Sequence, residues 1–256
     1  MKIVRFEFNS ALYFGAILGQ VIQPFNDSRI DLQNVLGAIP LESSLALSEV
    51  AIKEPCAPSK IVCVGRNYAA HTAELGNEVP KAPLLFLKAP SAVVSSGSNV
   101  KIPHQSQQVE HEGELAVIIG RTAKDISEMD DPLSYVFGYT CLNDVTARDV
   151  QRADIQFTRG KSFDTFCPVG PAIETELSPE SLHIETRVNG EIKQSGNTNQ
   201  MIFDIPFLIR YISQQMTLNS GDLIATGTPS GVSQLKRGDV CEVEIEHIGI
   251  LRNPIK

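Results

Sequence analysis

Residues 110–120, EHEGELAVIIG, constrain the fold most because they alternate polar and apolar side chains and then become continuously apolar. This pattern predicts a β-strand that enters a hydrophobic core. Side chains two positions apart on a strand lie on one face, so Glu112 and Glu114 project together. Ala116 and Ile118 continue the same face inward. Two neighbouring carboxylates at the edge of a core repel each other and lose hydration, which a bound cation relieves.

The pair of carboxylates predicts a site for a hard cation. Oxygen ligands favour Mg²⁺, Mn²⁺ or Ca²⁺ over zinc. A solvated strand end that carries two acidic side chains is the alternative that this segment alone leaves open.

The composition is that of an ordinary globular protein of 256 residues, with 42% hydrophobic and 20% charged residues. A formal net charge of −8, from 30 acidic and 22 basic residues, argues against a nucleic-acid-binding surface. The five cysteines contain no C-x-x-C pair, which argues against a disulfide framework or zinc ribbon and favours a reducing compartment. The most apolar segment, residues 11–22, is too short to span a bilayer, and the N-terminus lacks the pattern of a signal peptide. We therefore expect a cytoplasmic protein without a membrane segment.

Short apolar runs separated by Gly- and Pro-containing turns predict more strands than helices, without regular alternation, which is typical of the α+β class. Strands are expected at residues 2–8, 12–22, 61–64, 83–88, 110–120, 137–142, 186–189, 191–194, 223–226, 240–245 and 250–253. Helices are expected at residues 68–75, 143–157 and 202–215, with a short one within 32–51. Pro55 and Pro58 predict a boundary near residues 52–59, between a small β-containing N-terminal domain (1–55) and a larger domain (56–256).

Asp144 follows an apolar strand and precedes an expected helix, a position from which its side chain can reach the end of a neighbouring strand. Arg148 and Gln151 follow at the fourth and seventh positions, so all three share one helix face. An acid, a cation and an amide in this arrangement suit a metal, a carboxylate and a carbonyl oxygen respectively. The alternative is that Asp144 caps the helix and pairs with Arg148.

His71 and Glu74 lie three residues apart in NYAAHTAEL and hence on one side of a short helix. A glutamate can fix the tautomer of a histidine and raise its basicity, so that the histidine abstracts a proton. Gly65 and Gly76 flank this segment and suit a helix that closes over a site. An exposed helix that carries the pair by chance is the alternative.

Lys161 follows Gly160 in RGKSFDTF, which suggests an ammonium close to buried surface, where it needs an anionic partner. The turn TGTPSGV, residues 226–232, offers backbone amides and the Thr228 hydroxyl to a carboxylate. It lacks the spacing and the lysine of a P-loop. A surface lysine and an ordinary tight turn are the simpler alternatives.

Taken together and in this order, these motifs resemble the fumarylacetoacetate hydrolase (FAH) superfamily. The matching stretches are VGRNYAAHTAE (64–74), PLLFLK (83–88), HEGELAVIIG (111–120), GYTCLNDVTARDVQ (138–151), RGKSFDTFCPVGP (159–171), VNGEIKQSGNT (188–198) and LIATGTPSGV (223–232). They extend over residues 60 to 256, and as a set they are highly specific. The resemblance implies a mixed β-roll of layered sheets, α+β in class, and commonly a homodimer.

The resemblance also implies a role for each candidate residue. The metal ligands that it implies are Glu112, Glu114 and Asp144, for Mg²⁺ or Mn²⁺, with Ca²⁺ able to replace them in crystals. The catalytic residues that it implies are His71 and Glu74, as a dyad on a lid, and Lys161. The substrate-binding residues that it implies are Arg66, Arg148, Gln151 and Thr228.

Two differences separate this chain from the larger fumarylacetoacetases. Those enzymes add a fourth, upstream aspartate ligand, whereas no aspartate occurs here between Asp31 and Asp125. The chain also lacks their long N-terminal domain. It is more similar to the compact bacterial acylpyruvase and 2-hydroxyhepta-2,4-diene-1,7-dioate isomerase branch.

The resemblance implies an enzyme that acts on a small 2-oxo or 2,4-diketo acid. The expected reaction is metal-dependent hydrolysis of the C–C bond of an acylpyruvate or fumarylpyruvate, in which His71 activates water and an enolate of pyruvate leaves. The same enolate serves 2-hydroxyhepta-2,4-diene-1,7-dioate isomerisation, 5-carboxymethyl-2-hydroxymuconate delta-isomerisation, keto–enol exchange and oxaloacetate decarboxylation, which stay open as alternatives. A catalytically silent, metal-stabilised binding protein is the non-enzymatic alternative. The presence of the dyad, the lysine and all three ligands argues against it.

Overall fold

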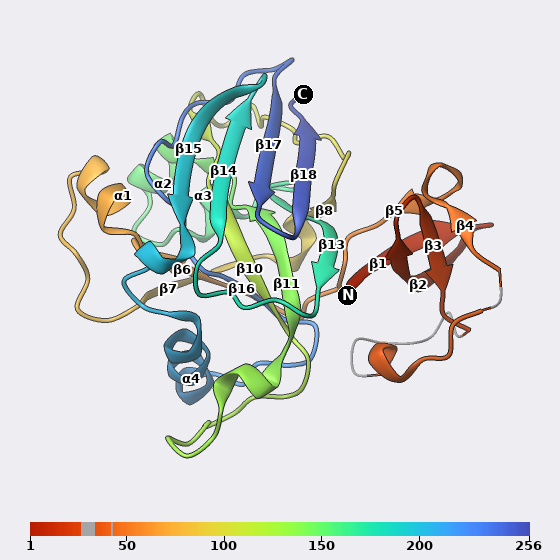
Figure 1. Cartoon of the computed structure of the whole chain (residues 1–256). Coiled ribbons are helices and arrows are strands. Elements are labelled where there is room, and N and C mark those ends of the chain that lie inside the picture. Colours follow the sequence, from red (N-terminus) through yellow and green to blue (C-terminus); the bar gives the residue numbers. More distant parts are fainter. Residues whose placement is uncertain (27–33, 42) are drawn as a thin grey trace.

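The structure, a computed structural model, describes residues 1–26, 34–41 and 43–256. In these ranges the chain forms many strands and few, short helices (Figure 1). The α+β class predicted from the sequence is therefore confirmed.

Most of the strands belong to one large mixed sheet. Its strands in the described ranges are β1 (Lys2–Phe8), β2 (Ala11–Leu18), β3 (Val21–Pro24), β4 (Leu45–Ala46), β5 (Ala51–Ile52), β6 (Ile61–Gly65), β7 (Leu84–Lys88), β8 (Val93–Ser95), β10 (Gly113–Ile119), β11 (Val136–Asn143), β13 (Cys167–Glu174) and β16 (Leu223–Ala225). The order along the sheet is β4-β3-β2-β1-β13-β11-β10-β16-β6-β7, with β5 paired to β1 and β8 to β13. Strand β10 therefore lies well inside the sheet, between β11 and β16.

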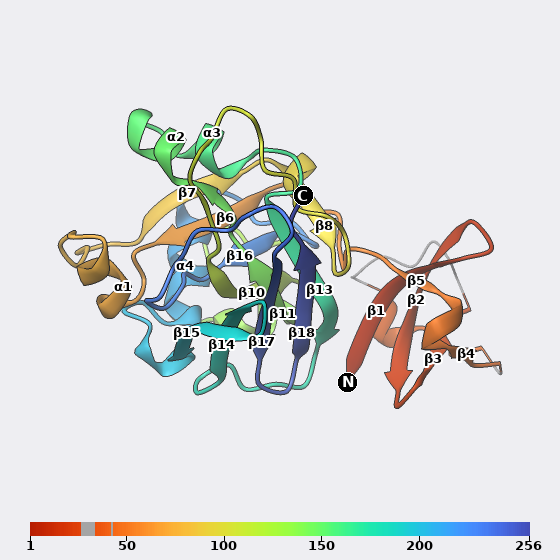
Figure 2. The same ribbon diagram turned by 90° about the horizontal axis from the view of Figure 1, so that it is seen from above.

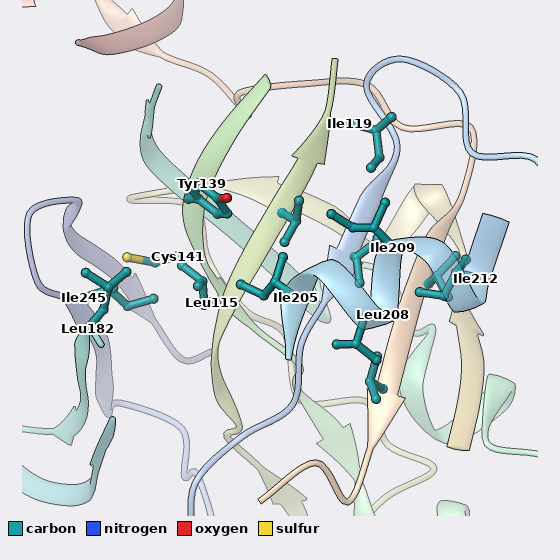
Figure 3. Packing of buried hydrophobic residues seen from close by; sticks show 14 of the residues in the cluster. Leu115, Ile119, Tyr139, Cys141, Leu182, Ile205, Leu208, Ile209, Ile212 and Ile245 are labelled. Atoms are coloured by element: carbon teal, nitrogen blue, oxygen red, sulfur yellow. The ribbon is translucent and has the colours of Figure 1, made fainter. Parts of the chain in front are cut away.

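A second, antiparallel sheet and the longest described helix cover one face of β10 and β11 (Figure 1). This sheet has the order β15 (Glu191–Asn197), β14 (His183–Val188), β17 (Val240–Ile245) and β18 (Gly249–Pro254). Helix α4 (Ile205–Gln215) lies beside it. Leu115 and Ile119 of β10 pack in one buried cluster with Ile245 of the second sheet and Leu208 of α4 (Figure 3). Burial of these apolar side chains holds the two layers together.

The opposite face of β10 belongs to a separate buried cluster. Ala116 and Ile118 pack there with Ile61 and Leu142. Glu114 is two residues before Ala116 and shares its face, as the period of two predicts. The prediction that Glu114, Ala116 and Ile118 share one face of this strand is thus confirmed, and the carboxylate of Glu114 lies at the beginning of that face.

The predicted strand at residues 110–120 is interrupted. It consists of β9 (Val109–Glu110), which pairs with β12 (Thr146–Ala147), and of β10, with His111 and Glu112 between them. The interruption arises because the backbone of Glu112 bonds elsewhere. Its amide donates to Asn143 Oδ1 at 3.0 Å, and its carbonyl oxygen accepts from the amide of Asp144 at 2.8 Å.

The predicted helix at residues 143–157 is wrong in its start and its length. Asn143 ends β11, and the helix α2 runs only over Arg148–Ala153, followed by α3 (Thr158–Lys161). Asp144 does not cap a helix, because both of its carboxylate oxygens bond to lysine side chains. The predicted helices at 68–75 and 202–215 are confirmed as α1 (Ala69–Glu74) and α4.

Two further predictions for the N-terminal part need correction. The strand predicted at 12–22 is two strands, β2 and β3, joined by a turn in which Gly19 has a φ of 65°. The helix predicted within 32–51 lies partly outside the described residues. In the described remainder, Val35–Gly37 and Leu47–Glu49 form 3-10 turns.

The first strands project from the rest of the molecule in Figure 2. Strand β1 nevertheless continues the large sheet, because Lys2 pairs with Glu174 and Ile3 with Ile173 of β13. The division into residues 1–55 and 56–256 stays a prediction. Nowhere in the described ranges is a helix both long and apolar enough to cross a membrane.

The carboxylate of Asp222 connects the turn before β16 to the segment that enters β6. Its Oδ1 accepts hydrogen bonds from the amide and the hydroxyl of Ser59, at 2.9 and 2.7 Å, and from the amide of Lys60 at 3.1 Å. Its Oδ2 accepts from the amide of Asn219 at 2.7 Å and pairs with the Lys60 ammonium. Burial alone raises the pKa of Asp222, but these donors outweigh burial and hold the pKa below its ordinary value.

We therefore expect Asp222→Asn to lower the free energy of unfolding by about 2 kcal/mol at neutral pH. A carboxyl whose folded pKa lies below its unfolded value of 3.8 stabilises fully above that value and loses this contribution as pH falls through the folded pKa. The difference between variant and native protein should shrink in urea titrations carried from neutral pH to about pH 3. Asp164→Asn, at an exposed carboxylate, is the control. An equal loss at every pH would show that the charge of Asp222 does not contribute.

Candidate active site

Three carboxylates converge where β10 begins and β11 ends. Oxygens of Glu112, Glu114 and Asp144 lie within 4.8 Å of one another, and all three residues are buried. The antiparallel pairing of β10 with β11 brings them together, because Glu114 pairs with Leu142 and Asp144 follows two residues later. The residues that the sequence predicts as metal ligands are thus neighbours in space.

Cations surround two of these carboxylates. Lys161 Nζ donates to Glu112 Oε2 at 2.6 Å and to Asp144 Oδ2 at 2.7 Å. Lys88 Nζ donates to Asp144 Oδ1 at 2.6 Å. Arg148 pairs with Glu112 through Nη2 and with Glu110 through Nε, the latter at 2.7 Å. These pairs compensate the buried charges on both sides.

Glu114 differs because no cation pairs with it in the part of the chain that the structure describes. Its only hydrogen-bond donor there is the amide of Gly227, at 2.8 Å from Oε2. Burial raises the pKa of the Glu114 carboxyl well above its ordinary value, and the negative charges of Asp144 and Glu112 raise it further. For Glu112 burial also acts upward, but Lys161 and Arg148 outweigh it and lower its pKa.

This charge distribution fits a divalent cation. Among the described residues of the cluster, four buried carboxylates (Glu110, Glu112, Glu114 and Asp144) face three cations (Lys88, Arg148 and Lys161). One negative charge is therefore left over, and it falls on Glu114. The donors are all oxygens, which suits Mg²⁺, Mn²⁺ or Ca²⁺. The three carboxylates together could hold such an ion.

A cavity of about 380 Å³ opens over the carboxylates. All of the site residues predicted from the sequence line it, except Glu74: Arg66, His71, Glu112, Glu114, Asp144, Arg148, Gln151, Lys161 and Thr228. Apolar side chains that include Leu84, Phe86 and Phe157 form part of its wall. A cavity of this size accommodates a small organic acid.

His71 and Glu74 form a hydrogen-bonded pair on helix α1. His71 Nδ1 lies 3.1 Å from Glu74 Oε2, and the imidazole is buried. The other carboxylate oxygen of Glu74 accepts from the amide of Gly231 at 3.0 Å. Within the described ranges no group bonds to His71 Nε2, so this nitrogen is available to a molecule in the cavity.

Three of the four residues predicted to bind substrate already have side-chain partners. Besides its two acidic partners, Arg148 donates from Nη1 to Gln151 Oε1 at 2.7 Å. Thr228 donates its hydroxyl proton to the Gly113 carbonyl oxygen at 2.8 Å and accepts from Gln194 Nε2 at 2.7 Å. Arg148, Gln151 and Thr228 are therefore held in place in the wall of the cavity.

Two buried residues that hold the site together, Lys88 and Gln194, are not among those predicted from the sequence. Lys88 fixes Asp144, and the signal that could have found it is a lysine at the end of the otherwise apolar run PLLFL. Gln194 connects Thr228 to His111, whose Nδ1 lies 3.1 Å from Gln194 Oε1. Burial lowers the pKa of His111, which favours its neutral form. No local pattern indicates this connection, because its members are far apart in sequence.

A family model described as fumarylacetoacetate (FAA) hydrolase C-terminal matches residues 60–256, and the chain belongs to this family of enzymes. The oxaloacetate tautomerase YisK of Bacillus subtilis is 47% identical over 225 residues, which cover 82% of this chain and 74% of YisK. The FAH-type fold expected from the sequence is confirmed by solved structures. A 5-carboxymethyl-2-hydroxymuconate delta-isomerase from Mycobacterium smegmatis has a TM-score of 0.89 at 36% identity, covering 100% of this chain and 99% of that one. A fumarylacetoacetate hydrolase from Exiguobacterium antarcticum has a TM-score of 0.85 at 39% identity. The match covers 100% of this chain and 99% of that one.

Proposed function

We propose that this protein is a divalent-metal-dependent enzyme that transfers a proton at the carbon next to the 2-oxo group of a small organic acid. The best-supported reaction is keto–enol tautomerisation of an oxaloacetate-like acid. The observation that carries the proposal is the presence of three converging carboxylates and of the His71–Glu74 pair at one cavity. The name of the relative from Bacillus subtilis supports the choice of substrate.

We assign different roles in this reaction to the residues of the cavity. Glu112, Glu114 and Asp144 would hold a hard divalent ion, which when bound would supply Lewis-acid stabilisation of negative charge on a 2-oxo oxygen. His71 removes or returns the proton through Nε2, since Nδ1 is held by Glu74. Lys161 adds positive charge at the same place, in a pocket shielded from water.

Hydrolysis of the C–C bond of an acylpyruvate, the reaction expected from the sequence, is the second candidate. It is favoured by the same dyad, because a buried imidazole oriented by a carboxylate can also activate water. The name of the solved relative from Exiguobacterium antarcticum supports it as well. The homodimer and the cytoplasmic location expected from the sequence stay predictions.

The test uses chelator-treated protein to which Mg²⁺ or Mn²⁺ is returned. Enol oxaloacetate is followed by its ultraviolet absorbance, acylpyruvate by its loss, and decarboxylation by the pyruvate formed. We expect metal-dependent acceleration of enol loss over a metal-containing buffer without protein. Cleavage of acylpyruvate without tautomerisation would favour the second candidate. No metal-dependent turnover of any of these acids would refute both.

A further inference from the structure

Arg66 provides an unused positive charge in the cavity. We propose that it binds a second, distal carboxylate, so that the site selects 2-oxo dicarboxylic acids over the corresponding monocarboxylic acids. This inference rests on the proposed function and narrows its class of substrate. The sequence predicts Arg66 only as one of four substrate-binding residues, without a part of the substrate to bind.

The guanidinium of Arg66 is half-buried and lines the cavity. Across residues 1–26, 34–41 and 43–256, no side chain or backbone group forms a hydrogen bond or an ion pair with it. Lys161 and Arg148, by contrast, are both committed to buried carboxylates. Arginine presents a planar fork of donors that matches a carboxylate, and such pairs are strong where water is partly excluded.

The backbone holds Arg66 in place. Its φ of 58° is an unusual conformation for a residue with a side chain, and it persists because the next residue is anchored. Asn67 donates from Nδ2 to the carbonyl oxygens of Thr226 at 2.8 Å and Phe203 at 3.0 Å. Its Oδ1 accepts from the amide of Phe203 at 2.8 Å. The strained backbone conformation therefore fixes the point from which the Arg66 side chain enters the cavity.

The charges of the site predict which acid fits. The four buried carboxylates and three cations leave one negative charge, and a divalent ion would turn this into one positive charge. The carboxylate next to a 2-oxo group would neutralise that charge. A second carboxylate then needs a cation of its own, and among the described residues that line the cavity Arg66 is the half-buried cation without a partner. A monocarboxylic acid would leave Arg66 unpaired.

Malate and lactate form a matched pair of stable probes, because they differ by one carboxylate. We expect calorimetry with Mg²⁺ present to show malate binding about 10- to 100-fold more tightly than lactate to the native protein. In Arg66→Gln this preference should nearly vanish, through weaker binding of malate and unchanged binding of lactate. Arg66→Asn is the second variant, since asparagine accepts a positive φ without strain.

The competing residue is Arg152, which also lines the cavity but is exposed and donates to Gln108 Oε1 at 3.2 Å. Arg152→Gln should keep the preference for malate. Loss of the preference in this variant, together with its retention in both Arg66 variants, would overturn the assignment. Equal binding of malate and lactate by the native protein would overturn it too.

Failure of this inference can be distinguished from failure of the proposed function. If oxaloacetate is turned over, Arg66→Gln should raise KM about 10- to 100-fold with little change in kcat, because the distal carboxylate does not react. Turnover with an unchanged KM would refute the role of Arg66 and leave the function standing. Absence of turnover would refute the function, while the malate and lactate titrations would still test Arg66.

Discussion

The variant Glu114→Gln is expected to lose the response of the protein to divalent metal and to be more stable than the native chain when metal is absent. Glu114 is buried and accepts only the Gly227 amide, with no cation beside it in the described structure. Its charge is tolerated only if a proton or a bound ion compensates it. The neutral amide of glutamine removes this cost, by about 1–3 kcal/mol in the metal-free protein.

The measurement is chemical denaturation with and without Mg²⁺. At a metal concentration of about 100 times the dissociation constant, the native protein should gain about 2.7 kcal/mol, and the variant should gain almost nothing. Metal-dependent turnover should disappear with the metal response. Glu180→Gln, at an exposed glutamate, is the matched control and should behave as the native protein. An undiminished metal response or full activity in Glu114→Gln would show that the ion, if any, is held elsewhere.

The variant His71→Asn is expected to lower the rate of proton transfer by about 10²- to 10⁴-fold. Asparagine removes the basic Nε2 that is free to face the cavity, while it leaves the three carboxylates in place. The stabilisation by Mg²⁺ should therefore be retained, in contrast to Glu114→Gln. Decarboxylation of oxaloacetate should be spared more than hydrolysis or tautomerisation, because loss of CO₂ needs no proton acceptor.

His104→Asn is the control for this variant, since His104 is an exposed histidine outside the cavity. Glu74→Gln supplies a graded comparison, because it keeps an oxygen for the Gly231 amide but loses the negative charge beside His71. We expect its effect to be smaller than that of His71→Asn. Loss of the Mg²⁺ response in His71→Asn would instead assign this residue to the binding of metal.

The face shared by Glu112 and Glu114 could be predicted because a strand has a period of two, which depends only on local sequence. The role of Asp144 was harder to infer. Its position after an apolar strand suggested a helix cap, but Lys88 and Lys161, which are 56 and 17 residues away, take its oxygens. Contacts between residues this far apart in sequence decide whether Asp144 caps a helix, and no local pattern records them.

Contacts between residues distant in sequence also explain why the partners of Arg66 and Arg148 could not be predicted. Arg66 could be placed in a matching motif, but its lack of a partner among the described residues is a property of the folded cavity. Arg148 shows the reverse case, because a cation next to a predicted metal ligand suggests a group that binds substrate, and this role stays a prediction. In the structure it is occupied by Glu110, Glu112 and Gln151. Charge balance in three dimensions therefore assigns roles that residue type alone cannot.

Glu74 receives its second hydrogen bond from the main chain at residue 231, not from a side chain. Only glycine fits there, since its φ is 105° and a Cβ atom would lie 1.9 Å from the Lys193 carbonyl oxygen. The orientation of His71, the proposed base, therefore depends through Glu74 on the backbone of a loop that lies 157 residues after Glu74 in the chain. A small shift of that loop would therefore change the proposed proton transfer without any substitution among the residues of the cavity.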